Sequence, residues 1–301
     1  MIAFLKKQWS KNKYVYIMLI PVLLYYVLFC YVPMYGVTIA FKNFIPLKGI
    51  LKSPWIGFQH FKSFFESYYF WRLIRNTLAI NIYSLVIGFP APIILALLLN
   101  EVRNTHYKRI VQTVSYLPHF VSIVIISGMI LQFTSRNGLV NQSLSLFGLE
   151  KIPFMLRPEW FRTVFVFSGV WQNAGWNSII YLAALSNISE EIYEASKIDG
   201  ANRWRQVIYI TIPGISSTII ILLILNIGSL MSVGFEKVIL LYNPSIYETA
   251  DVISSFVYRK GILEANFSYS AAVGLFNSII NFVLLMSSNY MSRKVSETSL
   301  W

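Results

Sequence analysis

Six stretches without any Asp, Glu, Lys or Arg constrain the fold of this chain more than any other feature of its sequence. They cover residues 14–36, 77–100, 112–135, 163–188, 207–233 and 268–291. Each is long enough for a helix to cross an apolar layer of about 30 Å, which takes about 20 residues. A helix also satisfies its own backbone hydrogen bonds, as a segment inside a bilayer must. The sequence therefore predicts an all-α membrane protein with six transmembrane helices.

The composition agrees with a membrane protein and argues against other classes. Only 13% of the 301 residues are charged, against about 25% in soluble domains. The net charge of +12 is no sign of nucleic-acid binding here, because Lys and Arg gather at the ends of membrane spans. The single cysteine, Cys30, cannot form an intrachain disulfide, and no metal site is predicted.

The basic residues predict which side of the membrane the chain ends face. The first run follows a cluster of lysines, but it is too long for a signal peptide and lacks a cleavage site, so we interpret it as a retained span. With the N-terminus inside, about half of the 25 basic residues fall in cytoplasmic segments, which are shorter and therefore more densely basic. We expect residues 1–13 and 292–301 to be cytoplasmic and residues 14–291 to form the transmembrane domain.

Three longer segments then lie outside, at 37–76, 136–162 and 234–267. They are rich in aromatic residues, which favour the depth of the membrane interface, and we expect short helices there. In "GLVNQSLSLFG" the apolar residues approximate a helical stripe that Gly148 ends. The segments are interpreted either as a landing surface for an outside partner or as an ordinary interfacial belt.

The sequence lacks the chemistry of several transporter and enzyme classes. Carriers driven by ions or protons usually keep ionisable residues at depth, whereas His119 is the only histidine in the six runs. We expect Pro118 to kink its run and His119 to satisfy a nearby polar group. No phosphate-binding loop, His-Glu-x-x-His or Gly-x-Ser-x-Gly motif is present. The chain is therefore predicted not to be an enzyme, and any ATP hydrolysis must come from another polypeptide.

A polar island, "EASKIDGANRWRQVIYITIP" at residues 194–213, separates two of the apolar runs. Ser189 suits an N-cap just before it, and carboxylates fall in the first turns, where the positive helix end favours them. Gly200 is expected to end this helix as a C′ glycine. A second helix is expected to begin about Asn202 and to lead into the fifth run through Pro213.

The short helix of this island is expected to dock against another protein. Its small residues, which let a partner surface approach the backbone closely, are Ala195, Ser196, Gly200 and Ala201. The alternative is an amphipathic connector on lipid head groups, which would favour Leu and Phe on one face and lysines on the other. The carboxylates and small residues of this helix favour docking.

Three short motifs in the island resemble the EAA loop of permease subunits of ATP-binding-cassette (ABC) importers. They are Glu194-Ala195-Ser196, Asp199-Gly200-Ala201 and Ile210-x-Ile212-Pro213. The chain departs from the family pattern at Ser196, where alanine is usual, and at Ile212, where leucine is usual. Further stretches, such as "WIGFQHF" at 55–61 and "VWQNAGWNSIIYLAAL" at 170–185, are similar to carbohydrate-uptake permeases, most of all to those for large, sometimes acidic, oligosaccharides.

This resemblance implies a type I ABC importer permease fold with a cytoplasmic coupling helix, in a multi-pass protein of the bacterial cell membrane. It also implies a transporter made of two different permeases, two ATPase subunits and a lipid-anchored, extracellular sugar-binding protein. The ATPases would hold ATP and Mg, so no cofactor is expected in this chain. Residues 189–213, the coupling segment, would transmit motion from the ATPases. Its coupling residues would be Glu194, Ala195, Ser196, Asp199, Gly200 and Ala201.

Polar and aromatic side chains in the fourth run predict a path for a sugar. Amides and hydroxyls hydrogen-bond to sugar hydroxyls, and aromatic faces stack on sugar rings. The candidates are Trp171, Gln172, Asn173, Trp176, Asn177 and Asn226, with Tyr181, Asn277 and Asn281 as further polar groups. Those on the fourth run cannot all face one way on a helix. The alternative is that these amides join neighbouring spans.

The leading hypothesis is therefore one permease subunit of an ATP-driven oligosaccharide importer. The alternative is a secondary carrier or channel for a small polar solute, although buried charges and an internal repeat are missing from the sequence. A third hypothesis is a membrane enzyme, whose only candidate carboxylates near the membrane face are Glu190, Glu191 and Glu194.

Overall fold

The structure, a computed structural model, is helical over the residues that it describes. These are residues 2–296 and 299–300, so the expected cytoplasmic tail at 292–301 lies partly outside them. In this part of the chain the only β-pairing is an isolated bridge between Lys42 and Trp55. The prediction of an all-α chain is confirmed.

The chain divides into two compact units. Unit 1 comprises Met1–Glu66 and Arg259–Leu275, and unit 2 comprises Ser67–Tyr258 and Phe276–Trp301. The last helix, α18 (Phe267–Ser296), begins in unit 1 and continues in unit 2.

Unit 1 contains one long apolar segment and a small aromatic cluster. The segment, Asn12–Phe41, is formed by α1 (Ile2–Tyr25), a π-helical turn (Tyr26–Tyr31), α2 (Val32–Met34) and a 3-10 turn (Tyr35–Phe41). After it come α3 (Gly49–Lys52) and α4 (Gln59–Phe65). Phe41 stacks on Trp55 with 5.6 Å between the ring centroids. The apolar side chains of the long segment are largely exposed, as a helix that faces lipid requires.

Unit 2 holds a second continuous apolar segment, Phe70–Glu101, which is 32 residues long. It consists of α5 (Phe70–Tyr83), a π-helical turn (Ser84–Gly88) and α6 (Pro90–Glu101). α6 packs along α10 (Pro158–Leu185). A third apolar segment, Phe267–Lys294, belongs to α18. These three segments have the length and composition to cross a membrane.

Two further runs are bent. α7 (Thr105–Tyr116), with a 3-10 turn (Leu117–Phe120), meets α8 (Ile123–Phe133) at 100°. The kink predicted beside Pro118 is therefore present, and just after it Ser122 caps α8 by accepting a hydrogen bond from the Val124 N–H. α12 (Arg203–Gln206), a π-helical turn (Val207–Thr211) and α13 (Ile212–Gly214) meet α14 (Ser216–Gly228) at 62°. Pro213 lies at this second bend.

Over the described residues the structure has three apolar spans, or five if each bent pair is one span, where the sequence predicts six. The missing run, 163–188, forms α10, a single helix of 28 residues. Its polar side chains, among them Gln172 and Asn173, interrupt its apolar stretch, and it is not among the apolar spans. The prediction of a continuous helix is correct for this run, but six spans are not confirmed.

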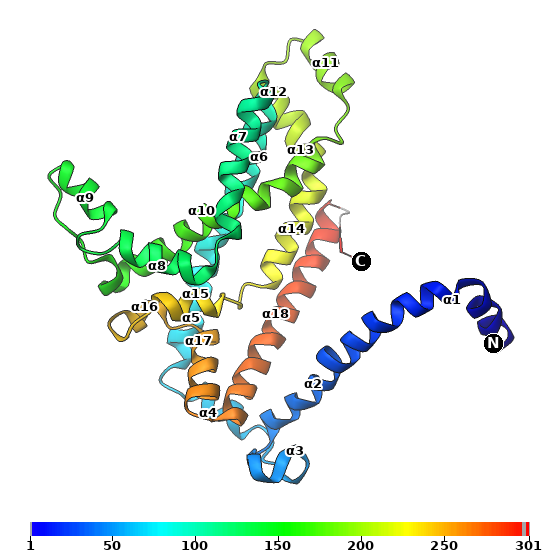
Figure 1. Ribbon diagram of the computed structural model, residues 1–301, viewed down its shortest axis with the longest axis vertical. Helices are drawn as coiled ribbons and strands as arrows, with labels where there is room; N and C mark the ends of the chain where they lie inside the picture. The colour runs from blue at the N-terminus through cyan, green and yellow to red at the C-terminus, as the bar shows by residue number, and fades with distance from the viewer. Residues whose placement is uncertain (1, 297–298, 301) are drawn as a thin grey trace. The chain divides into compact units, whose positions relative to one another are not determined.

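The outer segments form short helices, as predicted. In unit 2 they are α9 (Leu139–Leu146), α15 (Phe235–Leu241), α16 (Tyr247–Ala250) and α17 (Ile253–Tyr258). Gly148, with φ of +73°, follows the C-cap of α9 and ends it as predicted. Figure 1 shows α15, α16 and α17 grouped around α5. Their core includes the buried Ile80, Phe161 and Val238, which fix α5, α10 and α15 to one another.

Candidate functional site

The coupling segment forms the helix, turn and second helix that the sequence predicts. α11 (Glu190–Ile198) begins at Ser189, whose hydroxyl accepts a hydrogen bond from the Glu191 N–H at 3.3 Å. Its first turn carries two carboxylates, which the helix dipole stabilises. Asn202 caps α12 by accepting a hydrogen bond from the Arg205 N–H at 2.9 Å.

Gly200 closes α11 with a hydrogen-bond pattern that fixes the direction of the turn. Its N–H donates to Lys197 O at 3.1 Å, and the Ala201 N–H donates to Ser196 O at 2.9 Å. This pair of bonds is a Schellman motif. Gly200 has φ of +76°, and this left-handed region costs an L-residue about 1–2 kcal/mol. A Cβ there would meet no atom within 4 Å. Glycine is therefore favoured by the backbone conformation and not by a lack of space.

α11 is held to the rest of unit 2 by few contacts, and none of its side chains is buried. Figure 1 shows it beyond the ends of α6, α7 and α12. Tyr193 OH lies 3.0 Å from Thr211 Oγ1. Gln206 Nε2 donates to Ser196 Oγ at 2.9 Å. Ser196, which replaces the usual alanine of the EAA motif, therefore anchors α11 to α12.

The other predicted coupling residues lie on the accessible side of the turn. Four of them are exposed, namely Glu194, Ala195, Asp199 and Gly200, and Ala201 is half-buried. Large apolar side chains are exposed beside them: Ile198 is 87% exposed, and Trp204 is 77% exposed. Large apolar side chains exposed next to a protruding helix favour a surface that binds protein or membrane.

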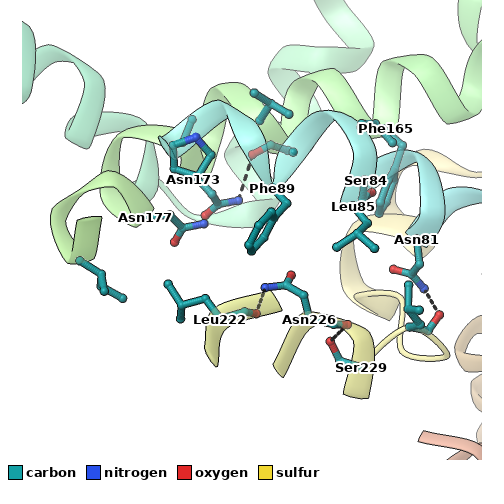
Figure 2. A pocket seen from close by; sticks show the side chains of 18 of the residues that line it. Asn81, Ser84, Leu85, Phe89, Phe165, Asn173, Asn177, Leu222, Asn226 and Ser229 are labelled. Atoms are coloured by element: carbon teal, nitrogen blue, oxygen red, sulfur yellow. Dashed lines mark hydrogen bonds between the residues drawn. The ribbon is translucent and has the colours of Figure 1, made fainter. Parts of the chain in front are cut away.

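A cavity of about 350 Å³, the first cavity, lies between α5, α6, α10 and α14. Figure 2 shows Asn173 and Asn177 of α10 on one side of it and Asn226 of α14 on the other, with the Phe89 ring between them. Three of the predicted path residues therefore share one cavity, and Tyr181 also lines it.

The amides of this region have different partners. Asn226 Nδ2 donates to Leu222 O of its own helix at 2.8 Å, and its side chain faces the cavity. Asn281 instead joins two elements, because its Oδ1 accepts a hydrogen bond from the Met231 N–H at 2.9 Å. Asn81, which the sequence did not single out, lines the cavity and donates to Leu230 O at 2.8 Å. Of the two roles that the sequence left open, linking elements fits Asn281. The path role of Asn226, whose side chain lines the cavity, stays a prediction.

The remaining predicted path residues point elsewhere. Trp176 stacks on His119, with 4.7 Å between ring centroids and 2° between ring planes. His119 Nδ1 lies 3.0 Å from Asn173 Oδ1, which is the polar partner expected for it. Trp171 lies in a separate depression against α6 and α7, and Gln172 lines a second cavity. These side chains do not all face one way, as expected for near neighbours on one helix.

The second cavity, of about 570 Å³, is lined by a residue that sequence reasoning missed. Lys237 of α15 is only 8% exposed, and its Nζ donates to Phe165 O of α10 at 3.0 Å. Burial lowers the pKa of Lys237 to about 8. Gln172 and Asn173 line the same cavity. No signal in the sequence marks this lysine, because it lies in an outer segment where lysines are usually solvated.

A buried ion pair in the outer segments was also missed. Asp251 is fully buried and accepts hydrogen bonds from Arg72 Nη2 at 3.2 Å and from Ser255 Oγ at 2.9 Å. Asn76 Nδ2 donates to Asp251 O at 3.0 Å, and Asn76 Oδ1 accepts from Arg162 Nη2 at 2.9 Å. The network ties α5 and α10 to the connection between α16 and α17.

Comparison with known proteins gives similarities over nearly the whole chain. Residues 88–297 match the family described as binding-protein-dependent transport system inner membrane component. Protein LplB of Bacillus subtilis (strain 168) is 45% identical over 97% of this chain and 92% of its own length. The polygalacturonan/rhamnogalacturonan transport system permease protein YteP of the same organism is 44% identical over 97% of this chain and 91% of its own length.

A solved structure is similar to this one in both sequence and fold. It is the crystal structure of a bacterial alginate ABC transporter in complex with an alginate pentasaccharide-bound periplasmic protein. One of its chains has 43% sequence identity and a TM-score of 0.90, and the similarity covers 98% of this chain and 99% of that one.

Proposed function

Since this chain belongs to the binding-protein-dependent transport system inner membrane component family, we propose that it is a permease subunit of an ATP-driven oligosaccharide importer. The family is a membrane component of transport systems and not an enzyme. The substrate class is supported by relatives named for the transport of polygalacturonan, rhamnogalacturonan and alginate, which are all carbohydrate polymers.

The observation that carries this proposal is the exposure of α11. A helix of nine residues, held by two side-chain hydrogen bonds, presents Glu194 and Ala195 to the surroundings. Glu194 would contact a basic residue of an ATPase subunit through a charge-assisted hydrogen bond. Ala195 would let that surface approach the backbone. Closure of the ATPases around ATP would then move α11 as a rigid body and shift α10 and α14 with it.

The proposed importer contains a second, different permease, two ATPase subunits and a lipid-anchored sugar-binding protein on the outside. The ATPases bind ATP and Mg, and the two ends of this chain, 1–13 and 292–301, face the cytoplasm. The membrane domain at 14–291 includes α10 as a sixth span. α10 has no charged side chain from Thr163 to Leu185, and its amides Asn173 and Asn177 line the first cavity, which is the proposed sugar path.

Co-purification with a candidate ATPase, followed by ATPase stimulation with a panel of oligosaccharides, tests the proposal. We expect the ATPase to co-purify with this chain and an oligosaccharide to stimulate it. Glu194→Lys should abolish co-purification, whereas Glu150→Lys, which reverses an exposed charge in an outer segment, should leave it intact. If the chain transports a solute without any ATPase, or if both variants behave alike, the proposal is wrong.

A further inference from the structure

Lys237 is a buried amine that lines the second cavity, next to the residues that this cavity shares with the first. Its Nζ donates to Phe165 O at 3.0 Å and stands 4.7 Å from the centre of the Phe165 ring. Lys237 lines the second cavity, which shares Phe165, Gly169 and Asn173 with the first. A Cβ on Gly169 would lie 3.5 Å from Nζ, so the glycine leaves the amine next to the backbone of α10. The amine therefore lies where the second cavity adjoins the proposed path.

No carboxylate pairs with Lys237 in the part of the chain that the structure describes. Glu236 lines the same cavity but is exposed, and no ion pair joins the two side chains. Desolvation is the cause of the lowered pKa of Lys237, with no carboxylate to oppose it. A buried ammonium without a counter-charge is costly, and such groups are kept mainly where they serve a function.

The surroundings of the amine suit an anion that also carries hydroxyl groups. An ammonium has three N–H donors, and one of them is used by Phe165 O. The side-chain amides of Gln172 and Asn173 line the same cavity and add donors and acceptors for hydroxyls. A neutral sugar would use the amides alone, whereas a sugar acid would also supply the missing negative charge.

We propose that Lys237 recognises a carboxylate of the passing oligosaccharide, so that this permease favours uronate-bearing sugars over neutral sugars of the same length. The inference rests on the proposed function, because it assigns a specificity residue to the same transport path. A purely structural Lys237 would only anchor α15 to α10 through Phe165 O.

The test compares tetragalacturonate with the same tetrasaccharide methyl-esterified at every carboxyl. The complete transporter is reconstituted in vesicles with its own binding protein, and ATPase stimulation is measured against sugar concentration. Lys237→Gln removes the charge but keeps an N–H donor for Phe165 O. We expect it to raise the half-maximal concentration of tetragalacturonate about tenfold and to leave that of the ester within about twofold. Because the binding protein is the same throughout, its own preference cancels between wild type and variant.

Two further variants serve as controls. Lys237→Arg keeps the charge and should keep the preference for the acidic sugar. Lys151→Gln removes an exposed lysine from an outer segment and should behave as the wild type does, which separates a local effect from a loss of net charge.

Equal loss for both sugars in Lys237→Gln would mean that the lysine is only an anchor, and an unchanged response to both would also overturn the inference. A wild type that responds to the ester alone would overturn the inference and leave the proposed function standing. A wild type that responds to no oligosaccharide would contradict the proposed function itself.

Discussion

Arg203 Nη1 donates to Glu101 Oε2 at 2.7 Å, and this ion pair joins α12 to the last residue of α6. The coupling segment thereby contacts α6, and within the segment Tyr193 of α11 meets Thr211 of the π-helical turn after α12. In the proposed importer, a movement of α11 and α12 would reach α6 directly.

Removing this ion pair should change stability little. Its side chains are 60% and 43% exposed, and exposed pairs contribute about 0–1 kcal/mol. A double-mutant cycle of Glu101→Gln and Arg203→Gln, followed by thermal unfolding at low and high salt, measures the pair energy. Salt should weaken it. A pair energy well above this range that salt leaves unchanged would contradict the prediction.

Gly200→Leu should leave the chain inserted in the membrane but uncouple ATP hydrolysis from uptake. The space around Gly200 accepts a side chain, but φ of +76° does not suit leucine, so the turn after α11 would reorient or carry about 1–2 kcal/mol of strain. Uptake and ATPase activity measured on the same vesicles should show uptake reduced severalfold while hydrolysis continues. Gly200→Asn, which tolerates this backbone region better, should retain more uptake.

Gly148→Leu is the matched control for this experiment. Gly148 has φ of +73°, closes α9 with the same pair of backbone hydrogen bonds, and has no atom within 4 Å of a Cβ. The variant should suffer the same local strain without uncoupling. Normal uptake by Gly200→Leu, or equal uncoupling by both variants, would show that the coupling segment does not dock as proposed.

Asp251→Ala should destabilise unit 2 by about 3–5 kcal/mol, the usual cost of breaking a buried ion pair. Arg72 would lose its carboxylate partner, and Ser255 would lose an acceptor. Removing both charges with Asp251→Ala and Arg72→Leu should cost less than removing Asp251 alone. Thermal unfolding in detergent checks this, with Glu159→Ala as control, because its pair with Arg157 is exposed. Similar melting temperatures for Asp251→Ala and Glu159→Ala would contradict the prediction.

Local features of the sequence predicted local structure well. Gly148 and Gly200 end their helices because a C′ glycine depends only on its own backbone angle and its neighbours. The uncharged runs also predicted where the long helices lie, because helix formation there depends on neighbouring residues. Whether such a helix is straight depends on single side chains as well. The third run breaks at Ser122, whose side chain caps a new helix at a steep angle.

Burial of polar residues could not be predicted, because it depends on contacts between distant segments. Lys237 and Asp251 lie in an outer segment, where charged residues are usually solvated, and they are buried because this segment packs against α10 and α5. Trp176 was predicted to line the sugar path, and the sequence could not show that it stacks on His119, which lies in the turn after α7.

Lys237 should make the stability of the chain rise with pH between about 8 and 10.5. Burial lowers its pKa from 10.5 to about 8 in the folded state. Below pH 8 the lysine is charged in both states, and the cost of burying the charge is present in full. As the pH rises through the folded pKa, the unfolded chain keeps a proton that the folded chain has lost. The free energy of unfolding therefore increases, by up to about 3 kcal/mol once the pH exceeds both values.

Lys237→Met should remove this dependence. The melting temperature of the variant should exceed that of the wild type at pH 7, and the difference should shrink steadily as the pH rises above 8. Comparing the two proteins at each pH cancels the titration of other groups, which they share. A difference that stays constant or grows with pH would mean that the amine is not desolvated in the folded protein, and it would remove the physical basis for assigning Lys237 a counter-charge from the substrate.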